Sequence, residues 1–146
     1  MKVSSLHDIW DSPDNSRLTP KQFSFRLPVH IAAKVAALCE MYPRKTRTQI
    51  IADLLTSALD DLECALPMRA GDPISEEDAH YLRLEAEHNR EKYEPLFHMA
   101  GARATFRELA NKHYQALETE LGNEKPGALY GGFMGSENYF NGKSKS

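Results

Sequence analysis

An alternating apolar and polar segment that runs into a proline constrains the fold of this chain more than any other feature. Residues 22–28 read Gln-Phe-Ser-Phe-Arg-Leu-Pro. Successive side chains of a strand point to opposite faces, so this segment predicts a short strand with two unlike faces. The apolar face would carry Phe23, Phe25 and Leu27, and the polar face Gln22, Ser24 and Arg26. A lone strand is unstable in water and no second convincing strand pattern follows, so we expect pairing with the same strand of a second chain.

The polar face of such a ribbon carries side chains that suit the major groove of DNA. Arginine can bond guanine through two hydrogen bonds, glutamine can bond adenine, and serine can bond either kind of partner. A two-stranded ribbon fits into that groove. The same three side chains would also suit the solvated face of an ordinary half-buried strand, which is the alternative interpretation.

Two helices are expected after the strand. Pro28 suits the first position of a helix, and apolar residues recur at helical spacing as far as Met41. Pro43 then interrupts the pattern, because proline disfavours helical geometry in the residue before it. Thr46, followed by Gln49 three residues later, is typical of a capping box that begins a second helix. The apolar face of that helix would comprise Ile50, Ile51, Leu54, Leu55, Ala58, Leu59 and Leu62.

The order of strand, helix, basic turn and capped helix, from residue 21 to about residue 63, resembles the Arc/MetJ-type ribbon-helix-helix family of DNA-binding domains. The resemblance implies that two chains intertwine, that the shared ribbon enters the major groove, and that the start of the second helix holds a phosphate. The chain departs from the family in the turn, where Pro43 stands at a position that the family commonly fills with glycine.

The resemblance also implies a role for each matching residue. The base-contacting residues would be Gln22, Ser24 and Arg26. The phosphate-contacting residues would be Lys21, Arg44, Lys45, Thr46, Arg47 and Thr48. The dimer core would comprise Phe23, Phe25, Leu27, Ile51, Leu54 and Leu55.

The distribution of charge agrees with that placement. The net charge is −3, but residues 17–47 hold seven basic residues and one acidic residue, whereas residues 70–146 hold nine basic and thirteen acidic. The positive segment therefore coincides with the motif. A unit of this size is also too small to bury an adequate core alone, which again favours a dimer.

The rest of the chain predicts a mainly α protein in several parts. Residues 1–20 read as a flexible arm, although Leu6, Ile9 and Trp10 recur at helical spacing, so that a short helix packed on the domain or a partner-docking patch is expected there. Residues 21–66 would form the DNA-binding domain and 67–74 a linker. A helical region would occupy 75–122, beginning at a cap on Ser75, and a disordered tail rich in glycine and aromatic residues would follow over 123–146.

The sequence gives little support for catalysis, and we expect no enzyme activity and no cofactor. Three pairs, Glu77 with His80, Glu85 with His88, and Glu94 with His98, have the spacing of helical metal ligands. A glutamate-rich helix produces such pairs by chance, so we expect no metal site. Two cysteines are too few for a disulfide framework, and neither a membrane span nor a signal peptide is evident, which favours the cytoplasm.

The sequence thus predicts a homodimeric, sequence-specific DNA-binding protein, a bacterial transcriptional regulator such as a repressor. Its partners would be double-stranded DNA and a second copy of itself, with a tetramer on DNA or a protein partner held by the C-terminal helices. Two alternatives stay open: the antitoxin of a toxin–antitoxin pair, and a dimeric adaptor that does not bind DNA.

Overall fold

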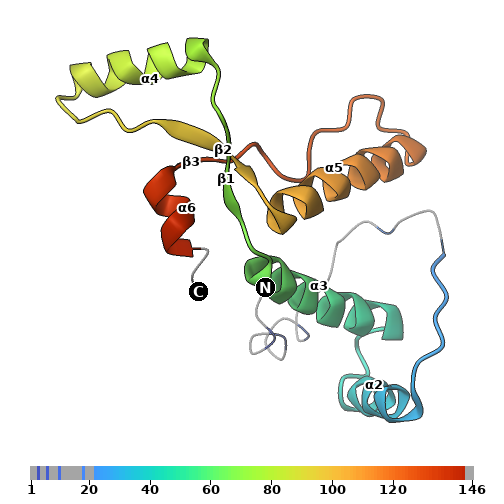
Figure 1. The fold of residues 1–146 in the computed structure, drawn as a ribbon. Helices are drawn as coiled ribbons and strands as arrows, with labels where there is room; N and C mark the ends of the chain where they lie inside the picture. Colours follow the sequence, from blue (N-terminus) through green and yellow to red (C-terminus); the bar gives the residue numbers. More distant parts are fainter. Residues whose placement is uncertain (1–2, 4–5, 7–9, 11–17, 19–21, 144–146) are drawn as a thin grey trace. The chain divides into compact units, whose positions relative to one another are not determined.

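The chain folds into two compact units, Met1–Ala65 (unit 1) and Leu66–Ser146 (unit 2), in the computed structural model. The structure describes residues 3, 6, 10, 18 and 22–143 (Figure 1). The boundary between the units lies one residue before the expected end of the DNA-binding domain. In the described part of the chain, no helix has the length and apolar character that crossing a membrane requires.

Unit 1 contains the two expected helices. Helix α2 spans Val29–Met41 and helix α3 spans Arg47–Ala65. The carbonyl of Pro28 accepts hydrogen bonds from the amides of Ile31 and Ala32, both at 3.0 Å, which places the proline where its missing N–H is not needed. The turn between the helices occupies residues 42–46.

A small core joins the N-terminal residues to these helices. Leu6 and Trp10 are buried against Ile50, and partly buried side chains of both helices and of the turn between them pack around this group. These partly buried side chains are Leu38, Cys39, Tyr42 and Leu54. The expected packing of the N-terminal segment on the domain is thus confirmed for Leu6 and Trp10, and a flexible arm is wrong for these two residues. Ile9 and most of residues 1–20 lie outside the described residues.

Unit 2 contains a small antiparallel sheet that the sequence did not predict. Its strands are β1 (Arg69–Pro73), β2 (Leu96–Ala100) and β3 (Met134–Ser136), in the order β1-β2-β3. Arg69 lies opposite Ala100, and Phe97 lies opposite Gly135. The mainly helical class is confirmed, but a linker over 67–74 is corrected, because β1 occupies most of it and gains its hydrogen bonds from β2.

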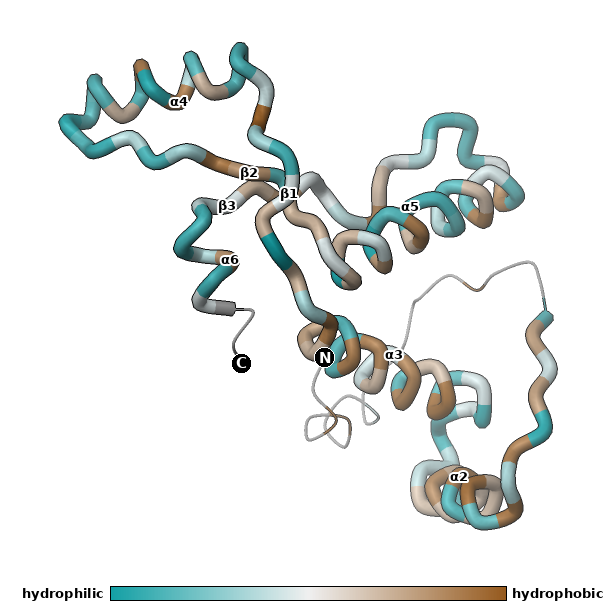
Figure 2. The backbone as a smooth tube through the Cα atoms, viewed as in Figure 1, coloured by the Kyte–Doolittle hydropathy of each residue, from teal (hydrophilic) through white to brown (hydrophobic). Residues whose placement is uncertain are grey.

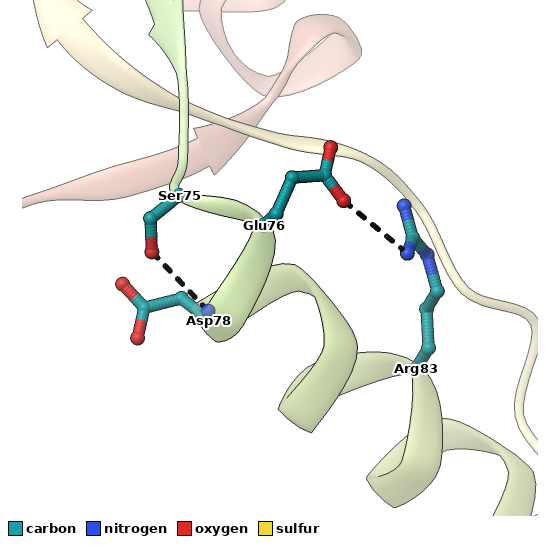
Figure 3. Close-up of polar contacts among 4 residues, drawn as sticks. All are labelled: Ser75, Glu76, Asp78 and Arg83. Carbon is teal, nitrogen blue, oxygen red and sulfur yellow. Dashed lines mark hydrogen bonds and ion pairs between the residues drawn. The ribbon is translucent and has the colours of Figure 1, made fainter.

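Three helices accompany the sheet: α4 (Glu76–His88), α5 (Ala102–Glu120) and α6 (Glu137–Lys143). The expected cap of α4 is confirmed, because the hydroxyl of Ser75 accepts a hydrogen bond from the amide of Asp78 at 3.2 Å (Figure 3). On the same helix, Glu76 and Arg83 form an exposed ion pair at 3.8 Å, which contributes little to stability. Helix α4 ends at His88, and two residues later Arg90 adopts a left-handed φ of 55°, which cannot continue a right-handed helix.

The C-terminal segment packs on the sheet, so the expectation of a disordered tail over 123–146 is corrected for its described residues, 123–143. Strand β3 and helix α6 lie within it, and α6 contacts both β1 and β3. Phe140 is only 1% exposed, and its ring meets those of Phe133 and Tyr139. A Cβ atom on Gly135 would lie 3.3 Å from the Phe140 ring, which explains the glycine beneath it. Phe140 is thus one of the buried core residues of unit 2, and Phe133 is partly buried against it.

Candidate nucleic-acid interface

The start of α3 carries the capping box that the sequence predicts. The amide of Thr46 donates to Oε1 of Gln49 at 2.9 Å, and the amide of Gln49 donates to Oγ1 of Thr46 at 3.1 Å. This reciprocal pair fixes the first turn of the helix. The remaining amides of a first turn have no intrahelical acceptor, and the helix dipole adds partial positive charge there, so this end suits an anion.

The basic residues around this cap differ in exposure. Arg44, Arg47 and Thr48 are exposed, as the phosphate-contacting role requires. Lys45 is only 9% exposed, so the single chain does not present its side chain to solvent as the resemblance implies. Its amide donates to the carbonyl of Tyr42 at 3.1 Å, which closes the turn. Lys21, the remaining residue of the expected phosphate-contacting set, lies outside the described residues.

The expected ribbon segment is extended and exposed. Residues 22–27, all of which the structure describes, form no strand in the single chain, and a ribbon between two chains stays a prediction. The polar side chains Gln22, Ser24 and Arg26 are exposed. Phe23 and Phe25 are 63% and 76% exposed, and their rings stack at 6.5 Å with an interplanar angle of 9°. The two rings therefore share one side of the segment, as an alternating pattern requires.

Helix α3 has apolar residues on two of its faces. One face carries Ile50 and lies on the core of unit 1, with Leu54 partly buried beside it. On the other face Ile51 is half-buried and Leu55, Leu59 and Leu62 are each about half exposed. These leucines recur at helical spacing, so they form a continuous exposed stripe.

Helix α2 is also poorly covered. None of its thirteen residues, all of which the structure describes, is buried, although most of them are apolar. Figure 2 shows the hydrophobic residues that run along α2, α3 and the extended segment before α2. In the predicted dimer core, Leu54 and Ile51 are half-buried while Leu27 and Leu55 are exposed. Unit 1 thus leaves a large apolar surface open in a single chain, and such a surface is typical of an interaction site.

Sequence reasoning missed a buried polar contact between Trp10 and helix α3. The indole Nε1 of Trp10 donates to Oδ2 of Asp53 at 2.6 Å, and both side chains are buried. The Trp10 ring also meets Tyr42 edge to face at 5.0 Å between ring centroids. One turn after Asp53, Ser57 is fully buried and its hydroxyl has no hydrogen-bond partner within the described structure. The sequence does contain a sign of this contact. Asp53 and Ser57 are polar residues on the same face of α3 as Ile50, which faces the core.

Unit 2 offers a groove of about 430 Å³ beside α5. One wall is fixed by Asn111, whose side-chain amide donates to the carbonyl of Tyr130 at 3.0 Å and whose Oδ1 accepts from the Tyr130 amide at 2.7 Å. The guanidinium of Arg107 lies 4.9 Å over the Tyr130 ring. This set of contacts holds residues near 130 on the helix, which is a structural role.

No cluster of three or more metal-ligating side chains occurs among the described residues. Glu94 and His98 lie in a loop and in β2, so the helical spacing that suggested a pair does not apply to them. No family model matches this chain, and no match was found among curated proteins or among solved structures.

Proposed function

We propose that this protein is a homodimeric, sequence-specific DNA-binding protein of the ribbon-helix-helix type, acting as a bacterial transcriptional regulator by operator occupancy. The observation that carries the proposal is the extended segment before α2. Phe23 and Phe25 stack together on it and are largely exposed, while Ser24 and Arg26 alternate with them. A second copy of the segment would cover the rings and set two polar rows side by side.

The exposed surfaces of the two helices support the same dimer. The stripe of Leu55, Leu59 and Leu62 on α3 and the uncovered α2 follow the segment in the chain. An intertwined partner would bury all three together, which would supply the core that a unit of this size lacks by itself. In the single chain, the only buried apolar residues described in this unit are Leu6, Trp10 and Ile50.

The cap of α3 supports contact with the phosphate backbone. Arg44 and Arg47 are exposed on either side of Thr46, whose capping box fixes the first turn. The partial positive charge of a helix start and two guanidinium groups favour a phosphate oxygen. In the proposed complex this contact positions the dimer, and the ribbon reads the bases.

Titration of purified protein with DNA tests the proposal. The operator is first obtained by selecting bound fragments from the source genome, and a scrambled duplex of equal length serves as the comparison. Arg26→Ala should lose roughly 1–3 kcal/mol of discrimination between the two duplexes if it reads a base. Arg47→Ala should weaken both alike and reduce the salt slope by about one unit for each phosphate that the protein no longer neutralises. A wild-type protein that binds neither duplex in a salt-dependent manner would refute DNA binding.

An antitoxin is the second candidate, and the separate, acidic unit 2 favours it. That unit has its own sheet and exposes Tyr81, Leu84 and Leu109, which suit contact with a second protein. In this case unit 1 would still bind DNA while unit 2 covers a toxin. Purification from the source organism separates the two functions, because an antitoxin should carry a small toxic protein with it. A dimeric adaptor, in contrast, would show neither activity.

A further inference from the structure

Trp10 contacts two parts of unit 1 that flank the proposed phosphate-binding cap of α3. Its indole N–H is bonded to Asp53, seven residues after Thr46 on the same helix, at 2.6 Å. The edge-to-face contact at 5.0 Å joins its ring to Tyr42, the residue that ends α2 and opens the turn. A single buried side chain therefore contacts both α3 and the turn that precedes it.

The conformation of the turn between α2 and α3 matters for phosphate binding, because it determines where Arg44 and the cap of α3 lie relative to each other. Pro43 has no amide hydrogen and cannot donate a hydrogen bond within the turn. The amide of Lys45 closes the turn by donating to the carbonyl of Tyr42, so the position of Tyr42 sets the path of the chain from there to Thr46.

We propose that Trp10 is a positioning residue for DNA binding: it holds Tyr42 against α3 and thereby fixes the turn that presents Arg44 and Arg47 to a phosphate. This inference rests on the proposed function. It adds Trp10 to the residues on which DNA binding depends, beside those of the ribbon and the two helices. Trp10 itself is 5% exposed, which leaves too little of its side chain accessible for a direct contact with DNA.

Variants at Tyr42 separate this role from general packing. Tyr42→Leu removes the ring that Trp10 meets but leaves the bond between Trp10 and Asp53 in place. Tyr42→Phe is the matched control, because it keeps the ring. Trp10 is the only tryptophan of the chain, so its fluorescence emission reports directly whether the indole is still buried in each variant.

The test titrates the full-length variants with operator and scrambled duplexes at several salt concentrations. Tyr42→Leu should bind both duplexes roughly tenfold more weakly, the scale of one charge-assisted hydrogen bond. Its salt slope should fall by about one unit for each phosphate that the arginines no longer reach. Tyr42→Phe, which keeps the ring that Trp10 meets, should bind more tightly than Tyr42→Leu and keep the larger salt slope. A protein that is merely less stable would lose active molecules without changing its salt slope.

The outcomes separate this inference from the function on which it rests. If the wild type binds no DNA, the proposed function fails. If the wild type binds and Tyr42→Leu, with Trp10 still buried, keeps its affinity and slope, the positioning role is overturned. If Tyr42→Leu does not fold, Trp10→Phe is tested in its place, because this variant cannot donate the hydrogen bond to Asp53. A reduced salt slope of Trp10→Phe supports the inference, and an unchanged slope overturns it.

Discussion

Replacing Phe25 by aspartate gives the sharpest test of the proposed dimer, because the single chain and the dimer predict opposite results. Phe25 is 76% exposed in the single chain, so Phe25→Asp should leave a genuine monomer unharmed. In the dimer the ring is buried. A phenylalanine buries about 200 Å², so about 150 Å² is left to be covered by the partner, worth at most about 4 kcal/mol per chain.

The dimer loses this contribution twice, at most about 8 kcal/mol, and gains two carboxylates in an apolar contact. At about 1.4 kcal/mol per factor of ten, the dimer dissociation constant should rise by several orders of magnitude. Sedimentation across a dilution series measures this change directly. Circular dichroism on the same samples reports whether α2, which has no buried residue in the single chain, stays helical.

Ser24→Asp is the matched control for this experiment. It places the same charge on the neighbouring residue, on the side of the segment opposite to Phe25. The variant should stay dimeric and lose DNA binding, because the carboxylate would face phosphate. A folded wild-type monomer at all concentrations, or a Phe25→Asp protein that sediments as the wild type does, would refute the ribbon.

Three further predictions follow from contacts in the two units. Thr46→Ala should lower the free energy of unfolding of unit 1 by about 1 kcal/mol in urea titrations, because the capping box loses its hydroxyl acceptor, and Thr46→Ser should restore it. Asn111→Leu should cost unit 2 about 2 kcal/mol for two missing hydrogen bonds and speed amide exchange at Tyr130, whereas unchanged exchange would contradict the proposed wall of the groove. A chain that ends at Leu66 should remain a folded dimer by light scattering and keep short-site DNA binding, and an unfolded product would mean that the two units share one core.

The helices of unit 1 could be predicted because their signals are local. Pro28, Thr46 and Gln49 act on residues within one turn of themselves, and the structure confirms the two helix starts that they indicate. The same holds for Ser75 at the start of α4. In each case a cap residue and helical spacing agree, and no distant segment is needed to decide the structure.

The sheet of unit 2 could not be predicted from local signals. Strand β1 contains Gly71 and Pro73, both of which are typical of linkers, and β3 has three residues. A Cβ on Gly71 would lie 2.9 Å from the Cβ of Ala100, so the glycine permits the close approach of β2 instead of marking a hinge. These strands exist because segments that are distant in the sequence pair with one another, such as Arg69 with Ala100 and Leu96 with Ser136, which an alternating pattern within one segment does not reveal.

The same contrast between local signals and contacts at long range applies to the candidate site. The cap of α3 and the exposure of Arg44 and Arg47 follow from the sequence near residue 46. The burial of Lys45 is not evident from that local sequence. The bond between Trp10 and Asp53 is not evident either, because it joins residues that lie 43 positions apart in the chain.

The place of Phe140 in the core of unit 2 has a consequence for biosynthesis. A chain grows from its N-terminus, so residues 1–65 leave the ribosome long before helix α6 is made, and domains generally fold as units in that order. Strands β1 and β2 cannot complete their core until Phe140 arrives. Translation that stops early should therefore release a protein whose first unit is folded and whose second is open to proteases, so that incomplete copies are removed before they accumulate.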